Sequence, residues 1–513
     1  MFLVVHTLSH ELRITNYESH RMEPLVLFED DHLLALNKPA GINTHAPDAL
    51  APEGLHEWLQ RRRGQPLAIH HRLDKETSGV LVFGKTAVAN RSLSEQFEQK
   101  TLRKTYLFLT VAAPPSKPLR VSSPVQGKPA ATVFEPAGRC GRFALIRATP
   151  ETGRTHQIRM HAAQNGFAVA GDALYETPTT PLPRLMLHAA SLELRHPQTG
   201  QTLRIEAPTP ATFSEPDWLT SAREFRSLLF DPADTNVCRL VSGAADGFPD
   251  AMVDRYGERL LVQWYGQPNQ RLRNALQSSA PMSQIVERSM EKQPIGETAS
   301  PESRFEIVEN GLKFSISLNA GYSTGLFLDQ RENRRRLLTS DLRGKTVLNT
   351  FAYTCAFSVA AARAGATVTS LDLSKRYLEW GRDNFRLNNI QPEAHDFIYG
   401  DCFDWLARLV KKGRNYDMVL LDPPTFSTVK KGRPFSAEKD YAKLVALAEP
   451  LLKPGGTLFC STNARLLSPQ RFMEAVKRGT ARARRMEFAT QPFDFRVAPG
   501  EKPYLKTVWV ELD

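Results

Sequence analysis

The chain has 513 residues and a formal net charge of +11, with 41% hydrophobic and 24% charged residues. This composition is typical of a globular protein and excludes a mostly disordered chain, while the length exceeds what one hydrophobic core usually supports, so we predict two to four domains. The excess of Lys and Arg favours a polyanionic partner such as a nucleic acid.

The five cysteines are widely scattered: Cys140, Cys238, Cys355, Cys402 and Cys460. They form no CxxC pair and no Cys/His cluster, so we expect neither a disulfide framework nor a metal site, and a reducing cytoplasm fits. The apolar residues 1–5 are too short a run for a signal peptide, and no run of about 18 apolar residues predicts a membrane helix.

Residues 25–41 are predicted to form two short apolar strands around an acidic turn, ended by Pro39 and Gly41. A short helical stretch follows and ends in three arginines, residues 61–63. Such a run is usually a solvated helix face, although in a nucleic-acid enzyme it could contact phosphate.

Residues 71–79, HRLDKETSG, place Asp74 between Arg72 and Lys75 in a tight turn. A carboxylate held ionised by neighbouring cations is how a nucleophile or a base is presented. Capping a helix or pairing with Arg72 is an equally good interpretation of Asp74. The next elements are a buried strand over residues 80–83, a helix to residue 99 and a strand that carries Tyr106.

Residues 152–161, TGRTHQIRMH, combine a Gly turn with several hydrogen-bond donors, among them Arg154. For His156 and His161 the preferred interpretation is hydrogen bonding within the fold. Further short motifs occur at residues 171–175 and 184–189.

These motifs, together with NKPAG at residues 37–41, resemble the RluA-type pseudouridine synthases over roughly residues 22–210. The resemblance implies an α+β domain with a mixed sheet and no cofactor. It also implies that Asp74 is the nucleophile, that Tyr106 stacks on the target base and that Arg154 pairs with the aspartate. A base inside a helix must be flipped out to react, and Arg72 is placed to fill the gap that it leaves.

Prolines end the apolar pattern after residue 207, so residues 1–210 are predicted as the first domain and residues 211–225 as a linker. Residues 226–320 are predicted to form a small α+β domain of short strands with Gly and Asp turns. Within it, residues 281–303 are rich in Ser, Glu and Pro and are predicted to be an exposed loop.

Residues 321–513 are predicted as an α/β domain with a doubly wound parallel sheet. A strand over residues 346–351 is followed by a turn, an Ala-rich helix and a second strand that ends in Asp372. An acidic residue at that strand end is typical of nucleotide-binding folds, where it takes the ribose hydroxyls.

This last module resembles a class I S-adenosylmethionine (SAM) methyltransferase. Residues 325–334 and the Asp422-Pro-Pro block are most similar to the RlmK and RlmI group of large-subunit ribosomal RNA methyltransferases. The resemblance implies that Asp372 binds ribose, that Asp401 lies beside adenine and that Asp422 lines the methyl-transfer pocket as a catalytic residue. The implied SAM contacts are Asn349, Phe351, Asp372, Leu373, Asp401, Cys402 and Asp422. A hydrogen-bonded structural role is the alternative for Asp401, as is inert packing for Cys402.

Two departures from this resemblance bear on function. Cys355 occupies a turn position that usually holds Gly, and a residue with a Cβ takes a positive φ less freely, which disfavours SAM binding. Asn463 stands where RlmI-type enzymes have the thiolate that adds to cytosine, and Cys460 is expected inside the strand core. These residues favour methylation of guanine N7, as in RlmK-type enzymes.

The sequence therefore predicts a bifunctional enzyme that isomerises uridine and methylates a base of large-subunit (23S) ribosomal RNA with SAM. Three alternatives stay open. The first is that only one module is catalytic while the other binds RNA. The second is that the methyltransferase acts on cytosine C5, and the third is that the chain is a non-catalytic ribosome-assembly factor.

Overall fold

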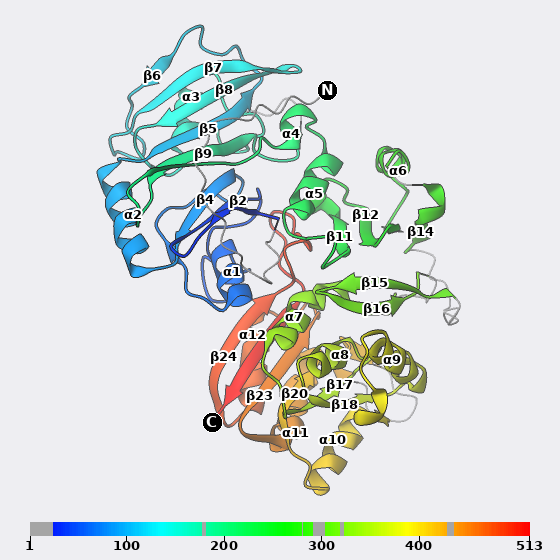
Figure 1. Cartoon of the computed structure of the whole chain (residues 1–513). Coiled ribbons are helices and arrows are strands. Elements are labelled where there is room, and N and C mark those ends of the chain that lie inside the picture. Colours follow the sequence, from blue (N-terminus) through cyan, green and yellow to red (C-terminus); the bar gives the residue numbers. More distant parts are fainter. Residues whose placement is uncertain (1–23, 177–180, 280, 291–302, 319–322, 428–434) are drawn as a thin grey trace.

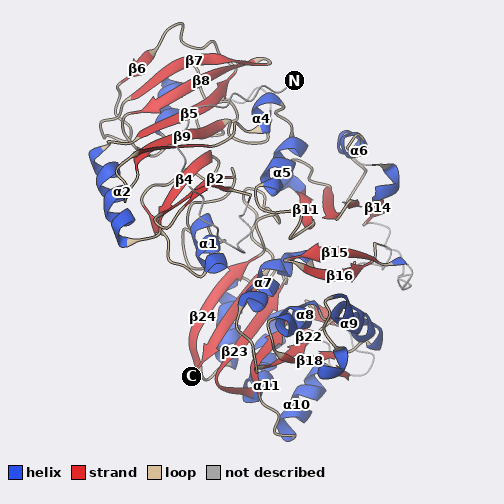
Figure 2. Cartoon of the chain, in the orientation of Figure 1, coloured by secondary structure: helices blue, strands red, loops and turns tan. Residues whose placement is uncertain are grey.

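A computed structural model describes residues 24–176, 181–279, 281–290, 303–318, 323–427 and 435–513. Two large sheets lie at opposite ends of the molecule, and a smaller module lies beside their junction (Figures 1 and 2). We call residues 24–210 the N-terminal module, residues 237–316 the middle module and residues 323–513 the C-terminal module. None of the helices within these described ranges is long and apolar enough to cross a membrane.

The N-terminal module is built on a ten-stranded sheet of order β1-β2-β4-β9-β5-β8-β7-β6, with β3 paired to β4 and β10 to β9. Its strands are β1 Val26–Glu29, β2 Leu33–Lys38, β3 Ala68–Ile69, β4 Ser78–Gly84, β5 Arg103–Thr110, β6 Leu119–Val121, β7 Thr132–Cys140, β8 Phe143–Pro150, β9 Leu187–Arg195 and β10 Thr202–Glu206. The β4–β9 pair is parallel and β5–β9 is antiparallel, so the predicted mixed sheet is confirmed.

Helices cover both faces of this sheet. Alternate residues of β2 and β4 pack on one face against α1 (Leu55–Arg63) and on the other against α2 (Ala87–Gln99). Burial on both faces explains why these strands are continuous apolar runs in the sequence. The third helix, α3 (Gln157–Gln164), packs against β7 and β8.

The arginine run at residues 61–63 differs from its prediction as a solvated or phosphate-binding face. Arg61 pairs with Glu53 at 2.7 Å, and Arg63 pairs with Glu29 at 2.7 Å. Arg62 pairs with Glu332 of the C-terminal module at 2.9 Å, and both side chains are about nine-tenths buried. The run is therefore part of a junction between modules.

Residues 211–225, predicted as a linker, form two helices instead, α4 (Ala211–Ser214) and α5 (Trp218–Ser227). The prolines lie at the helix starts, where their missing N–H groups would have no helical partner. Asp217 caps α5 by accepting hydrogen bonds from the N–H groups of Leu219 and Thr220. Proline therefore marks helix starts here rather than an extended connection.

The middle module contains a four-stranded sheet of β11 (Val237–Ser242), β12 (Ala251–Tyr256), β13 (Arg259–Trp264) and β14 (Ile285–Ser289), in that order. Helix α6 (Gln270–Gln277) connects β13 to its parallel neighbour β14. Residues 285–289 form β14, although they lie in the stretch predicted to be an exposed loop. Pairing with β13, rather than local composition, makes them a strand. Residues 291–302 lie outside the described part of the chain. A hairpin of β15 (Phe305–Glu309) and β16 (Leu312–Ile316) completes the module.

The C-terminal module has a seven-stranded sheet of order β19-β18-β17-β20-β23-β25-β24. Its strands are β17 Thr346–Thr350, β18 Thr367–Asp372, β19 Asp396–Tyr399, β20 Tyr416–Leu421, β23 Leu452–Thr462, β24 Ala483–Thr490 and β25 Lys506–Leu512. The first five strands in this order are parallel, and β25 runs antiparallel to both of its neighbours, β23 and β24. The helices are α7 Arg331–Thr339, α8 Ala356–Arg363, α9 Lys375–Leu387, α10 Cys402–Lys411, α11 Ala437–Ala448 and α12 Pro469–Gly479. The predicted doubly wound α/β fold is confirmed.

Candidate active sites

A cavity of about 810 Å³ opens in the N-terminal module and contains Asp74. It is lined by the turn before β4, by β5, and by the segment between β8 and α3. The turn is closed by a hydrogen bond from Thr77 N to Asp74 O at 3.0 Å. Gly79 then enters β4 with φ +112°, and a Cβ there would lie 2.2 Å from Ala189 O. The close approach of β9 therefore fixes where the Asp74 turn ends and β4 begins.

The cation nearest to Asp74 among the described residues belongs to Arg159. Arg159 Nη1 lies 3.6 Å from Asp74 Oδ2, and His156 Nε2 lies 3.7 Å from the same oxygen. Arg159 is itself held by Asp172, which accepts hydrogen bonds from its Nε at 2.6 Å and its Nη2 at 2.7 Å. Its guanidinium also lies over the ring of Tyr175. This arrangement orients the Asp74 carboxylate within the cavity.

Arg154, predicted to pair with Asp74, does not contact it in the structure. Its Nε donates to Pro129 O at 3.3 Å, and the residue lies on the wall of the cavity. Both arginines come from one motif, but only Arg159 is on α3, three residues beyond His156 and on the same helix face. That spacing is the signal that the sequence offered for Arg159.

The two histidines of the motif have different environments. His161 is fully buried between Thr132 Oγ1 and Ser123 O, as expected for a structural histidine. His156 instead faces the cavity, with its Nδ1 3.1 Å from the hydroxyl of Tyr175 and its Nε2 toward Asp74. Tyr175 and Asp172 join the site through the motif at residues 171–175.

Tyr106 lies on β5 and lines the cavity. Its cross-strand neighbours are Ala148 and Ala189, whose small side chains leave room beside the ring. Burial, and then the charge of Asp74, raise the pKa of the phenol, so the hydroxyl stays protonated at neutral pH. Arg72 lies at the rim, where its Nη2 donates to Thr155 Oγ1 at 3.4 Å.

The C-terminal module has its candidate site at the ends of the parallel strands. The loop between β17 and α8 contains three non-glycine residues with positive φ: Phe351 at 54°, Tyr353 at 50° and Cys355 at 62°. Cys355 therefore adopts the positive-φ conformation that was expected to favour Gly at this position. Its Sγ is buried against α9 at Gly381, where a Cβ would lie only 2.4 Å away. The missing Cβ at Gly381 makes room for the one at Cys355.

Asp372 ends β18 and holds this loop. Its Oδ2 accepts a hydrogen bond from Tyr353 N at 2.8 Å, and its Oδ1 accepts one from Ser374 N at 2.8 Å. Burial raises its pKa. A carboxylate has about four acceptor positions, so capacity remains for the hydroxyls of a ribose. Leu373 and Tyr399 are exposed beside it, at the ends of β18 and β19, and they offer the apolar surface that an adenine ring prefers.

Three other predicted SAM contacts have side chains bound within the fold. Asn349 is buried and donates to Ser358 Oγ at 2.9 Å. Asp401 caps α10 by accepting hydrogen bonds from the N–H groups of Phe403 and Asp404, which is the structural role weighed as its alternative. Cys402 is buried, and burial raises the pKa of its thiol. If Asn349 and Cys402 contact SAM as predicted, we therefore expect their backbone atoms to make the contact.

Asp422, at the end of β20, faces a polar cluster that the sequence analysis did not find. Gln330 Nε2 donates to Asp422 Oδ1 at 3.2 Å and to Ser461 Oγ at 2.7 Å. Asn333 Nδ2 donates to Gln330 Oε1 at 2.8 Å and so orients this amide. Burial raises the pKa of Asp422 to about 6. The available signal for Gln330 and Asn333 was the motif at residues 325–334.

The cysteines are not placed to attack a base. Cys460 is fully buried, as predicted, and burial raises the pKa of its thiol. Asn463 stands at the position where RlmI-type enzymes have the catalytic thiolate. Its Oδ1 accepts a hydrogen bond from Thr425 Oγ1. Of the five cysteines, four are buried and Cys140 lies on β7 of the other sheet.

Comparisons with known proteins match both modules. Residues 32–164 match the family model of RNA pseudouridylate synthases, and residues 291–504 match that of SAM-dependent methyltransferases. The putative ribosomal RNA large subunit methyltransferase YwbD of Bacillus subtilis is 34% identical over 313 residues, which are 57% of this chain and 79% of that protein. Ribosomal large subunit pseudouridine synthase C of Yersinia pestis is 42% identical over 210 residues, 36% of this chain. The chain spans 65% of that synthase, just under two thirds of its length.

A solved structure agrees with the fold of the second site. A putative methyltransferase complexed with SAH superposes with a TM-score of 0.52 and 25% identity, over 69% of this chain and 98% of that one. The fold and the two sites thus define a two-module enzyme, with a pseudouridine synthase module followed by a class I methyltransferase module. The chain belongs to the SAM-dependent methyltransferase family and carries an RNA pseudouridylate synthase domain before it. Both predicted resemblances are confirmed.

Proposed function

We propose that this chain isomerises a uridine to pseudouridine and methylates a base, at guanine N7, in large-subunit ribosomal RNA. The observation that carries the proposal is that one chain holds both groups of candidate residues: the Asp74–Arg159 pair in its cavity, and Asp372 with Asp422 at the strand ends. Relatives of both modules are named for large-subunit ribosomal RNA, and the net charge of +11 suits a polyanionic substrate.

In the N-terminal module, Asp74 acts as the nucleophile. The reaction breaks the bond between C1′ and N1, rotates the uracil and joins C5 to C1′. C5 loses a proton and N1 gains one, and the bond that Asp74 forms is broken again before the product leaves, so the product is an isomer of the substrate. Arg159 orients the attacking carboxylate, because Asp172 fixes its guanidinium. The cavity of about 810 Å³ has room for a flipped nucleotide, with Tyr106 against the base and Arg72 at the rim.

In the C-terminal module, SAM supplies the methyl group when it is bound. Asp372 accepts hydrogen bonds from its ribose hydroxyls, Leu373 and Tyr399 offer an apolar surface for adenine, and Asp422 faces the reacting base. Guanine N7 attacks through its lone pair, loses no proton and leaves a positively charged base. An ionised Asp422 stabilises that charge, and no thiolate is required.

Nucleoside mass spectrometry of large-subunit ribosomal RNA, from cells with and without the protein, tests the proposal. We expect one pseudouridine and one 7-methylguanosine to disappear together. Loss of 5-methylcytidine instead would overturn the N7 assignment. Loss of one modification alone would show that only one module is catalytic, and loss of neither would favour a non-catalytic assembly factor.

A further inference from the structure

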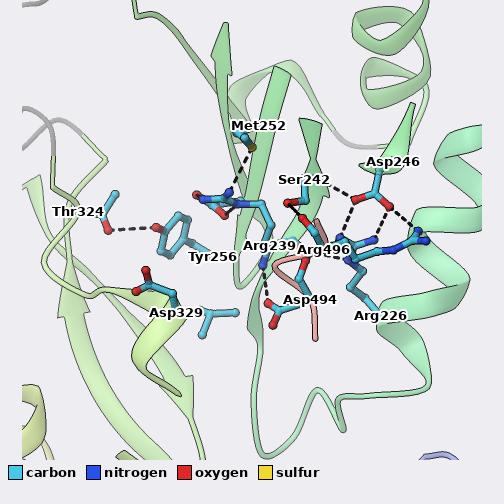
Figure 3. Close-up of polar contacts among 12 residues, drawn as sticks. Arg226, Arg239, Ser242, Asp246, Met252, Tyr256, Thr324, Asp329, Asp494 and Arg496 are labelled. Atoms are coloured by element: carbon cyan, nitrogen blue, oxygen red, sulfur yellow. Dashed lines mark hydrogen bonds and ion pairs between the residues drawn. The ribbon is translucent and has the colours of Figure 1, made fainter. Parts of the chain in front are cut away.

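The segment between β24 and β25 belongs to the C-terminal module but contacts the middle module (Figure 3). It also contacts the N-terminal module. We call residues 491–497 the interface loop. Its Arg496 donates from Nη1 to Asp246 Oδ1 at 2.9 Å, and Ser242 Oγ donates to Arg496 O at 2.8 Å. Asp494 accepts hydrogen bonds from Arg331 Nη1 at 3.0 Å and from Arg239 N at 2.9 Å. Several of these charged groups are fully buried, so the course of the loop is fixed on both sides.

Arg496 also reaches the N-terminal module. A Cβ on Gly41 would lie 2.8 Å from Arg496 Nη2, so the guanidinium rests on the bare Cα of this residue. Gly41 has φ +93°, a conformation that other residues rarely adopt. The guanidinium carbon of Arg496, Cζ, also lies 5.0 Å from the centroid of the Phe225 ring on α5. Arg496 is thus held between α5 and the turn at residues 39–41.

This turn is bonded directly to the loop that carries the nucleophile. Gly41 N donates to Lys75 O at 2.7 Å. The buried ammonium of Lys38 donates to Pro39 O, Ile42 O and Lys75 O at 2.8, 2.8 and 3.0 Å. Lys75 is the residue after Asp74. An unbroken series of contacts therefore runs from Asp246 through Arg496, Gly41 and Lys75 to the catalytic turn.

Apolar contacts run in parallel with this series. Phe493 of the interface loop packs on Trp58 of α1, with 5.7 Å between the ring centroids. Both belong to the apolar cluster that contains Leu73, the residue before Asp74. Phe225 and Leu229, which follow the N-terminal module in sequence, lie in the same cluster. The apolar cluster next to Asp74 therefore includes side chains from outside the N-terminal module.

We propose that Arg496 is a positioning residue for uridine isomerisation, although it belongs to the methyltransferase module. The inference rests on the proposed function of the Asp74 site. Arg496 supports the turn at residues 39–41, and that turn holds Lys75 and so the backbone of Asp74. Because misplacing a reacting group by about 1 Å can reduce a rate about 100-fold, support at this distance affects the chemistry.

The test uses the full chain with Arg496→Ala. We expect kcat for pseudouridine formation to fall by about tenfold or more while KM for RNA changes less than about twofold, since the substrate does not contact this residue. Arg496→Lys should recover part of the rate. Arg484→Ala, at an exposed arginine of β24 paired with Glu511, is the matched control and should change neither constant.

Amide hydrogen exchange provides a readout that does not depend on activity. Arg496→Ala should accelerate exchange at residues 39–44 and 73–78, and the Arg484 control should not. If Arg496→Ala fails to fold, Phe493→Leu takes its place with a smaller effect expected in the same direction. Unchanged kcat and unchanged exchange would overturn the inference. Faster exchange in a protein whose wild type forms no pseudouridine would support the coupling and reject the proposed function.

Discussion

Arg159 Nη1 lies 3.6 Å from the carboxylate of Asp74, and two hydrogen bonds to the buried Asp172 fix the guanidinium there. The pair joins the turn before β4 to α3, two elements separated in sequence by strands β4 to β8. In the proposed function isomerisation depends on this pair, which distinguishes Arg159 from the other arginine of the same motif.

Replacing Arg159 with Lys should reduce pseudouridine formation by about 100-fold, because a point charge cannot keep both the Asp172 fork and the contact with Asp74. Release of tritium from 5-tritiated uridine in the RNA measures the rate, since C5 loses its hydrogen. Arg154→Ala is the matched control and should reduce the rate only a few-fold, through weaker RNA binding. A larger loss at Arg154 than at Arg159 would contradict the assigned roles.

The two activities should be separable by single substitutions in the sites themselves. Asp74→Asn should abolish pseudouridine and spare methylation, because the amide is no nucleophile and the substitution is isosteric. Asp372→Ala should do the reverse by removing the acceptor for the ribose hydroxyls and the anchor of Tyr353 N. Both products are measured in one RNA digest. Loss of both modifications in either folded variant would count against independent sites.

Gly381→Ala should impair SAM binding, because the added Cβ would meet Cys355 Sγ at 2.4 Å. Overpacking of this kind costs about 1–3 kcal/mol, and the shift reaches the loop that Asp372 holds. We expect an affinity loss of about tenfold by calorimetry. Cys355→Gly should leave SAM binding near the wild-type value and should restore it in the double variant. A double variant as weak as Gly381→Ala would show that the two residues do not compensate for one another.

The raised pKa of Asp422, about 6, predicts how methylation depends on pH. Burial makes protonation easier, so the rate of methyl transfer should fall as pH drops through about 6. For stability the sign is opposite: the folded-state pKa lies above the unfolded value, so this group contributes stability below about pH 4 that is lost as pH rises through 6.

Asp422→Asn tests that assignment. The variant should unfold at a higher temperature than wild type at pH 7 but not at pH 4, by an amount corresponding to about 1–3 kcal/mol, and it should lose methylation. Thermal melts at both pH values provide the measurement. Equal melting differences at the two pH values would mean that Asp422 does not titrate in this range.

Many of the elements, and the contiguous motifs that carry the site carboxylates, can be predicted from local sequence. The apolar runs and Gly or Pro turns gave β17, α8 and β18 within a residue or two, and Asp74, Asp372 and Asp422 were identified because each lies inside a short motif. Such motifs are local: the turn or strand end that presents the carboxylate is formed by its immediate neighbours. The order of the doubly wound sheet follows from the same alternation of strand and helix.

Which distant side chains contact one another is seen only in the folded structure. Arg159 rather than Arg154 reaches Asp74 because the phase of α3 turns it toward the cavity. Positive φ at Cys355 is accommodated because Gly381, on another helix, has no Cβ. Arg496 belongs to the support of Asp74 because two modules pack together. The last two contacts depend on packing between elements that are distant in sequence, which no local pattern encodes.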